Sequence, residues 1–266
     1  MIAAPRSVKA QGVLVAPTVI FANSRTRSAT MDLINTSAGT SEITVETKFG
    51  YPVTDSAGGI SVRFVDSVGA SAPSIAKYVV AYPRKFSLAA GVKQTVRLLV
   101  NAPASLTDGE YWSRIIITSK GGPLKLSSAN PADTGAIRVG VSLEVRTVTT
   151  LLYRKGSVTS VMSPPEISAR RVGDSVIVQA QVSRAGTGVF LGMAHLSVLD
   201  AVGKVASHLD RQLPVYYPMS PRYALAVPPA TRGPLSVELT LAPDRDDVPL
   251  RDRLPFPPVI ATAIVK

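Results

Sequence analysis

The chain has 266 residues, a length that favours two compact domains over one. Hydrophobic residues make up 45% of it and charged residues only 18%, which excludes a disordered chain and a coiled coil. No apolar run approaches the roughly 18 residues that a membrane-spanning helix needs. The absence of cysteine excludes disulfides, thiolate metal ligands and cysteine nucleophiles.

Positive charge is concentrated in the first half of the chain. Of the formal net charge of +11, residues 1–156 contribute 18 basic and 9 acidic side chains, and residues 157–266 contribute 11 and 9. This excess indicates either an acidic or carboxylate-bearing partner or scattered surface charge without a partner. A nucleic-acid partner is not expected, because the chain has one tryptophan and no run of basic residues.

Residues 1–12 are predicted to be a leader outside the folded domains. They lack the apolar stretch of a complete secretory signal, although Ala10 places a small residue before a potential cleavage point. The segment is interpreted either as the remnant of a secretory signal or as a disordered leader.

Short strands separated by turns are predicted throughout residues 13–156. The 21 prolines and 19 glycines punctuate a chain rich in Val, Thr and Ser, which is typical of β-structure. Residues 42–49 alternate apolar and polar positions and predict a strand with one buried face. Pro17 places the first strand, residues 13–21, at a sheet edge or a bulge. Further strands are predicted at residues 30–35, 58–65, 78–82, 94–100 and 111–118.

The most informative stretch covers residues 136–153. Apolar residues occupy every second position from Ile137 to Val145, and the apolar phase then shifts by one residue at Val148. A phase shift inside a strand predicts a bulge or a change of environment.

The length of this stretch limits how it can be buried. At about 3.3 Å per residue it would span about 60 Å, whereas a typical strand covers about 17–20 Å. It therefore contains either two strands or one long strand that leaves apolar side chains exposed. The lack of a turn dipeptide favours the single long strand. An open apolar edge makes sense if it pairs with the sheet of another chain.

Residues 157–266 are predicted to form a second all-β domain of about 100 residues. The predicted fold class is therefore all-β, with two immunoglobulin-like β-sandwich domains in tandem, over residues 13–156 and 157–266. Strands of the second domain are predicted at residues 175–182, 195–199, 223–227, 235–241 and 259–265.

Several segments, taken in order, resemble the PapD-like periplasmic chaperones of pilus assembly. Residues 15–21 (VAPTVIF) and 33–35 (LIN) resemble the first two strands of that family. Residues 83–97 (PRKFSLAAGVKQTVR) are similar to its proline, glycine turn and Val-Arg strand, and residues 106–112 (LTDGEYW) to the entry of its sixth strand. Residues 137–153 are similar to its seventh strand and domain exit. The second domain is similar only in size and strand content.

The resemblance implies a function, a compartment and partners. Members of this family act in the periplasm, where they bind incomplete immunoglobulin-like pilus or fimbrial subunits by donating an edge strand. The implied partners are such a subunit and an outer-membrane usher, and no cofactor is implied. The resemblance assigns subunit binding to alternate side chains of the seventh strand: Ile137, Val139, Val141, Leu143 and Val145.

The sequence departs from the family at the residues that anchor the subunit's terminal carboxylate. The family uses two basic residues in a cleft, whereas the equivalent positions here are Thr18 and Thr150. Hydroxyl groups donate hydrogen bonds but lack the charge that makes carboxylate binding strong. Arg146, Arg154 and Arg25 are the candidate substitutes.

Enzymatic chemistry and metal binding are not expected. His195 and His208 lack a matching acid–nucleophile arrangement, and His195 is interpreted as structural. Arginines interrupt the acidic residues between Asp244 and Asp252, which favours a solvated loop over a calcium site. One alternative stays open for the whole chain: a structural or adhesive immunoglobulin-like protein of the cell envelope, in which the edge over residues 137–145 is buried.

Overall fold

The computed structural model describes residues 12–121, 143–229, 231 and 233–266. These residues form an all-β protein, as the sequence predicts, with only two short 3-10 turns, η1 (Ala76–Tyr78) and η2 (Leu250–Asp252). Their contacts divide the chain into two compact units. Unit 1 comprises residues 1–48, 74–104 and 112–153, and unit 2 comprises residues 49–73, 105–111 and 154–266. The division into domains at residues 156 and 157 stays a prediction.

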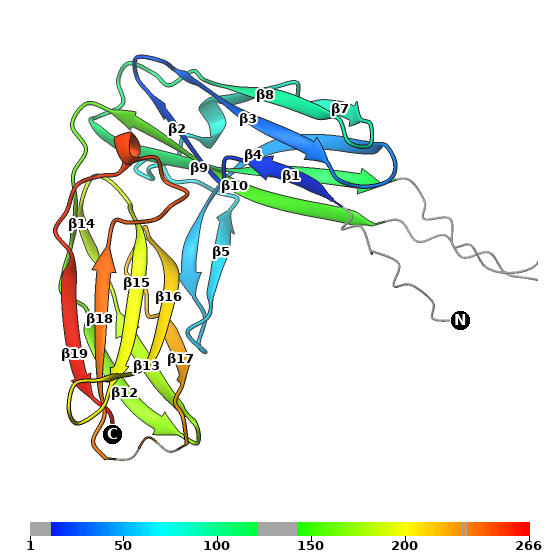
Figure 1. Cartoon of the computed structure of the whole chain (residues 1–266). Helices are drawn as coiled ribbons and strands as arrows, with labels where there is room; N and C mark the ends of the chain where they lie inside the picture. The colour runs from blue at the N-terminus through cyan, green and yellow to red at the C-terminus, as the bar shows by residue number, and fades with distance from the viewer. Residues whose placement is uncertain (1–11, 122–142, 230, 232) are drawn as a thin grey trace, which may run out of the picture. The chain divides into compact units, whose positions relative to one another are not determined.

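Unit 1 contains two sheets (Figure 1). One has the order β1-β3-β8-β6, and the other has the order β2-β10-β9-β4 before it continues into β5, with β7 also paired to β4. The bounds are β1 (Val13–Ala16), β2 (Val19–Asn23), β3 (Ser28–Asn35), β4 (Ser41–Thr54), β5 (Ile60–Val65), β6 (Val79–Tyr82), β7 (Lys85–Leu88), β8 (Lys93–Val100), β9 (Gly109–Gly121) and β10 (Glu144–Lys155).

Alternating side chains build the core of unit 1. In β4, Ile43 and Val45 are buried while Glu46 and Lys48 stay partly or fully exposed, so the predicted alternation over residues 42–49 is observed. The only tryptophan, Trp112, is fully buried among these strands. It is therefore a fluorescence probe of the fold of unit 1.

The predicted first strand is split at Pro17. Residues Val13–Ala16 pair with β3, whereas β2 belongs to the other sheet, beside β10. Proline has no backbone N–H to donate to a ladder, so a strand is readily interrupted there. The sequence predicted an edge or bulge at this residue, and the structure shows that the chain changes sheets.

Unit 2 is a second pair of sheets, with the orders β12-β13-β17 and β16-β15-β18-β19, and a short β11-β14 pair. In β15 every second residue is buried, and the two sheets enclose one apolar cluster. Strands β12 and β16 were not predicted from the sequence. The bounds are β11 (Ser160–Met162), β12 (Glu166–Val172), β13 (Ser175–Gln181), β14 (Arg184–Gly186), β15 (Phe190–Leu199), β16 (Val205–Val215), β17 (Arg222–Ala226), β18 (Ser236–Ala242) and β19 (Val259–Ile264).

The hairpin formed by the end of β4 and β5 groups with unit 2. The ring of Tyr51 meets that of Tyr217 edge-on, with centroids 4.6 Å apart. At the tip of the hairpin, Gly58 accepts a hydrogen bond from the amide of Arg222 at 3.0 Å. Gly58 has a φ of +81°, and a Cβ there would lie 2.3 Å from the Cβ of Arg222, so only glycine fits.

Asn35 organises the turn after β3. Its buried side-chain amide donates to the backbone oxygens of Gly39 and Leu88, both at 2.8 Å. Its side-chain oxygen accepts from the amide and the hydroxyl of Ser37, at 2.9 and 2.6 Å. The turn at residues 35–37 is thus held by one side chain that connects three parts of unit 1.

Replacing Asn35 with alanine is expected to destabilise unit 1 by about 2 kcal/mol, because the Leu88 oxygen loses its buried partner. Urea unfolding followed by Trp112 fluorescence measures this. The matched control is Asn23→Ala, which removes an exposed cap on the amides of Arg25 and Thr26 and is expected to cost less than about 1 kcal/mol. Equal losses in the two variants would contradict the role of Asn35.

Candidate functional site: the edge of β10

The two halves of β10 lie in different environments. From Glu144 to Val148 the side chains are half-buried or exposed, and Val148 retains 42% of its accessible surface. From Thr149 to Tyr153 every side chain is buried, and Leu151 and Leu152 are completely inaccessible. The shift in apolar phase at Val148 thus coincides with a change of environment, one of the two explanations that the sequence offered.

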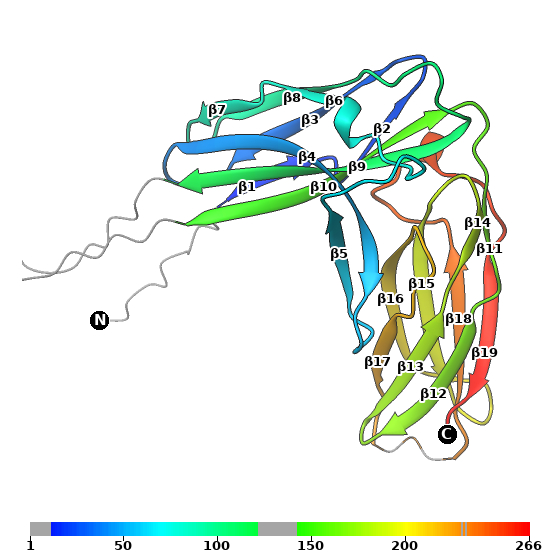
Figure 2. The ribbon, with the colours of Figure 1, turned by 180° about the vertical axis from the view of Figure 1, so that it is seen from behind.

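Only the second half of β10 is flanked by strands on both sides. The amide of Thr150 donates to the oxygen of Thr18 at 3.4 Å, where β2 begins. From there β2, which has five residues, follows the later part of β10 in both ribbon views (Figures 1 and 2). Within the described part of the chain, residues 144–148 therefore pair with β9 on one side and with no strand on the other.

Two of the five residues predicted to bind a subunit can be placed. Leu143 directly precedes β10, is 45% exposed and accepts a hydrogen bond through its oxygen from the amide of Gly121 at 3.3 Å. Val145, the second residue of β10, is half-buried. Ile137, Val139 and Val141 lie outside the described residues.

The side chains between these apolar positions are charged. Glu144 forms ion pairs with Lys120 at 3.1 Å and with Arg146 at 2.9 Å. Hydrogen bonds from Lys120 and then from Arg146 lower the pKa of the Glu144 carboxyl below its usual value. Because neighbouring residues of a strand point to opposite faces, Glu144 and Arg146 share one face of this segment with the exposed Val148, and Leu143, Val145 and Thr147 share the other.

Thr18 and Thr150, the positions aligned with the family's basic anchors, lie side by side. The Thr18 side chain is exposed, whereas Thr150 is buried and its hydroxyl accepts a hydrogen bond from the guanidinium of Arg114. Arg114 lies on β9 and is itself only 7% exposed. A positive charge is therefore held at the point where the open edge of β10 ends.

The three arginines predicted to substitute for the anchors lie elsewhere. Arg146 precedes Thr150 by four residues, about 13 Å along a strand, and pairs with Glu144. Arg25 follows the far end of β2, where its backbone amide donates to Asn23. Arg154 donates to the fully buried carboxylate of Glu110 at 2.6 Å and to the oxygen of Asp252 at 2.8 Å.

Arg114, which contacts Thr150, is not among the residues predicted from the sequence. A signal for it exists, since it is the one charged residue inside the apolar strand predicted at residues 111–118. Its role depends on a contact with Thr150, which is 36 positions away and cannot be inferred from local pattern.

The described residues show no group of His, Asp and Glu side chains placed to hold a metal ion, and no helix among them is long and apolar enough to span a membrane. The chemistry available at β10 is that of an unpaired strand edge: backbone donors and acceptors in a row, with alternating side chains on each face.

No known family model matches the chain, and no curated protein sequence matches it. Solved structures of chaperones from chaperone-usher pilus systems are similar to it over nearly its whole length. A crystal structure of the YadV chaperone is 15% identical, with a TM-score of 0.45, and the match covers 95% of this chain and 98% of that one. The SafB chaperone, solved with the SafA pilin of Salmonella enterica, is 14% identical with a TM-score of 0.44, and the match covers 97% of this chain and 99% of that one. The CsuC–CsuE chaperone–tip subunit complex of Acinetobacter baumannii matches with 13% sequence identity and a TM-score of 0.44. That match covers 96% of this chain and 98% of the other.

Amide hydrogen exchange of the free monomer tests the open edge. Amides of residues 144–148 that point away from β9 are expected to exchange about 100-fold faster or more than those of Leu151–Tyr153, because no strand covers them. Slow exchange of all amides in residues 144–148 would show a covered edge, and would favour the structural or adhesive alternative.

Proposed function

We propose that the chain is a periplasmic chaperone that binds and stabilises an incomplete immunoglobulin-like pilus or fimbrial subunit by donating the edge of β10. The observation that carries the proposal is the loss of strand cover along residues 144–148, beside the exposed side chain of Leu143. The resemblance of residues 15–21, 83–97 and 106–112 to the PapD-like chaperones supports the same function.

An open edge next to apolar side chains is costly for a protein that acts alone. Unpaired strand edges promote aggregation, and monomeric proteins usually cover or shorten them. A partner that lacks one strand of its own sandwich would satisfy the backbone groups of residues 144–148 and bury Leu143 and Val145. The same contact thus lowers the tendency of both proteins to aggregate.

The end of the open edge indicates how the partner strand is placed. A strand added along residues 144–148 must stop near Thr18, because β2 occupies the edge of β10 beyond that point. There it meets the exposed Thr18 hydroxyl and the positive charge of Arg114. We infer that Arg114 supplies the charge for a terminal carboxylate of the subunit, in place of the family's basic pair.

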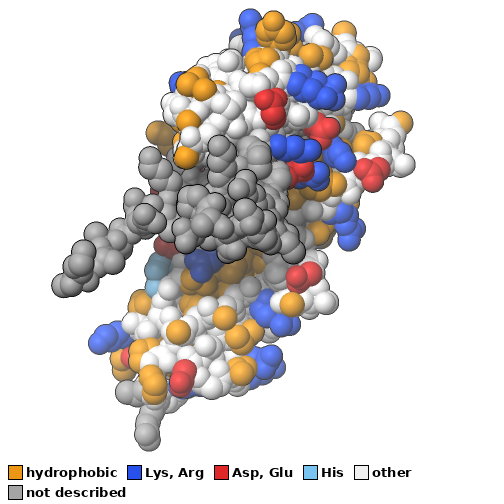
Figure 3. All heavy atoms as spheres, turned by 90° about the vertical axis from the view of Figure 1, so that its right-hand side faces the viewer, with side chains coloured by type: hydrophobic (Ala, Val, Ile, Leu, Met, Phe, Trp, Pro, Cys, Tyr) orange, Lys and Arg blue, Asp and Glu red, His pale blue; other side chains and the backbone are white. Residues whose placement is uncertain are grey.

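Surface charge supports an acidic partner. Basic side chains, with acidic ones between them, spread over the visible face of unit 1 in Figure 3. Residues 1–156 carry an excess of nine positive charges. Such a field raises the rate at which an acidic partner is encountered, more than it raises the final affinity. The usher remains a further proposed partner.

The alternative function, a structural or adhesive protein of the cell envelope, is favoured by one observation. Neither Thr18 nor Thr150 carries the charge with which the family anchors a subunit. In that case residues 144–148 would be covered in the free protein, and no incomplete subunit would bind.

Leu143→Glu is expected to reduce capture of the subunit from a periplasmic extract at least tenfold, because a carboxylate would have to enter an apolar groove. The matched control is Val202→Glu, at an apolar position that is 86% exposed in the β15–β16 turn. Both variants should keep the unfolding midpoint of the parent. Capture that is unchanged in Leu143→Glu would reject strand donation by this segment.

Arg114→Met is expected to weaken binding of a subunit, or of its C-terminal strand peptide, by about 10- to 100-fold when the terminus is a free carboxylate. An amidated peptide should bind the parent and Arg114→Met equally. Arg170→Met, at an exposed position of β12 in unit 2, is the matched control. An equal loss for both peptides would show that Arg114 acts on folding and not on the carboxylate.

A further inference from the structure

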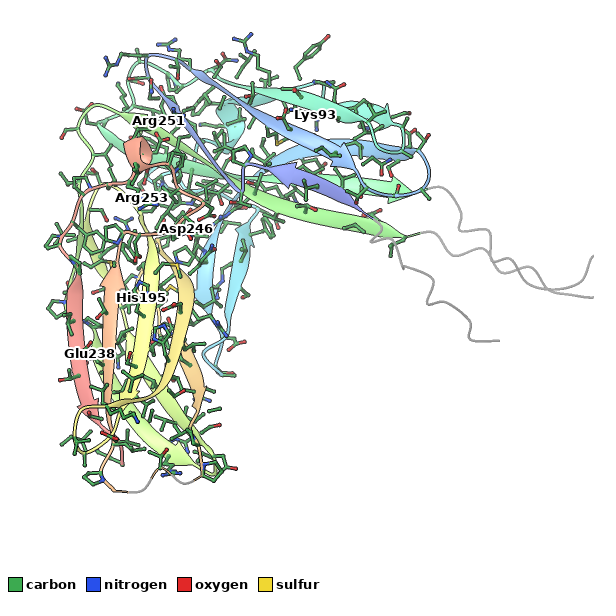
Figure 4. The ribbon with its side chains drawn as sticks, viewed as in Figure 1. Lys93, His195, Glu238, Asp246, Arg251 and Arg253 are labelled. Carbon is green, nitrogen blue, oxygen red and sulfur yellow. The ribbon has the colours of Figure 1, made fainter. Side chains whose placement is uncertain are left out.

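His195 lies between two carboxylates on the outer face of unit 2. It is on β15, between the fully buried Ala194 and Leu196, and its side chain points away from the core (Figure 4). Its Nδ1 lies 2.6 Å from Oδ1 of Asp210 on β16, and its Nε2 lies 2.9 Å from Oδ2 of Asp244.

This geometry determines the charge of the ring. A neutral imidazole has one donor and one acceptor nitrogen, whereas an ionised carboxylate only accepts. The Asp210 carboxyl is ionised, since hydrogen bonds from His195 and then from His208 keep its pKa below the usual value. Both ring nitrogens can hydrogen-bond their partners only when both carry hydrogen, which makes His195 an imidazolium.

Asp244 belongs to the loop between β18 and β19, over residues 243–258. The loop is tied together internally: Arg245 binds Asp247 in a bidentate pair, and Arg253 donates to the oxygens of Val248 and Arg245. Apolar contacts also attach the loop to unit 2, since Val248 is buried and the ring of Phe256 meets that of Phe190 edge-on, with centroids 4.9 Å apart.

One attachment point is the bond from Asp244 to His195. Another is the backbone oxygen of Asp252, which accepts a hydrogen bond from Arg154 at the end of β10. Arg154 in turn binds Glu110, whose second oxygen accepts from the amide of Val189 at 2.7 Å. The loop is thus connected within unit 2 to the last residues of β10.

We propose that His195 is a pH-sensitive latch, which as an imidazolium ties Asp244 and its loop to Asp210 on β16 and releases them when it loses its proton. This inference does not depend on the proposed chaperone function.

The charges around His195 favour the protonated ring. Asp210 and His208 face it from β16, Glu238 lies on β18, and Asp244 and Asp246 come from the loop. On β16, Arg211 directs its guanidinium to the backbone oxygen of Asp210. Partial burial lowers the pKa of His195, but the hydrogen bonds and charges of Asp210 and Asp244 together outweigh it, so the pKa is raised above 6.5.

The sign of the pH dependence follows from this direction. A group whose pKa is raised by folding stabilises the folded form fully below its unfolded value, and the contribution disappears as the pH rises through the folded value. The loop is therefore expected to be held at pH 5.5 and released well above the folded pKa of His195.

Hydrogen exchange of the full chain at pH 5.5 and 8.5, corrected for intrinsic rates, tests the latch. In the parent, protection of residues 244–254 should fall about tenfold between the two values. His195→Gln should show, at both pH values, the low protection that the parent shows at pH 8.5. His208→Gln, which removes the only other histidine, should behave like the parent. A second variant, Asp244→Asn, leaves the ring and Asp210 in place and should also abolish the pH dependence.

Proton NMR gives an independent measurement, because His208→Gln leaves His195 as the one histidine whose ring is observed. That ring should titrate above the ordinary histidine value of 6.5. Titration of His195 at or below 6.5, protection that does not change with pH in the parent, or parent-like protection in His195→Gln would each overturn the latch.

Discussion

The change of sheets at Pro17 is the constraint on which the candidate site depends. Because proline cannot continue a hydrogen-bonded ladder, the chain leaves β3 after Ala16 and resumes as β2 beside β10. The five residues of β2 cannot cover the twelve of β10. Among the described strands, only β9 lies beside residues 144–148, and the functional proposal for β10 depends on this segment.

The sequence predicts those features that arise from local pattern. Alternation over residues 42–49 identified the buried face of β4, and the shift at Val148 located the change of environment within β10. Strand β16 escaped prediction because its middle is polar and leaves Leu209 as the one apolar residue between Ala206 and Leu213. The exchange of sheets at Pro17 was not foreseen either, since partner choice depends on distant strands and not on the residues of the strand itself.

Arg114 illustrates the same limit for the site. An arginine is expected to be exposed, yet this one is buried, with its guanidinium bonded to Thr150 across the pair of β9 and β10. The predicted substitutes for the missing basic anchors, Arg25, Arg146 and Arg154, are close in sequence to Thr18 and Thr150. In a sheet, however, the nearest side chain is the one on the neighbouring strand, and its sequence separation is set by the topology.

The charges on the open edge explain how it can stay open without indiscriminate pairing. Glu144, with Lys120 and Arg146, occupies one face of the segment, and Leu143, Val145 and Thr147 occupy the other. Charged side chains on an edge strand disfavour pairing with a flat sheet, which would bury both faces and desolvate the ion pairs. A partner with a groove on one side only would cover the apolar face and leave the charges in water. In the proposed function, this arrangement favours an incomplete sandwich over a second exposed strand.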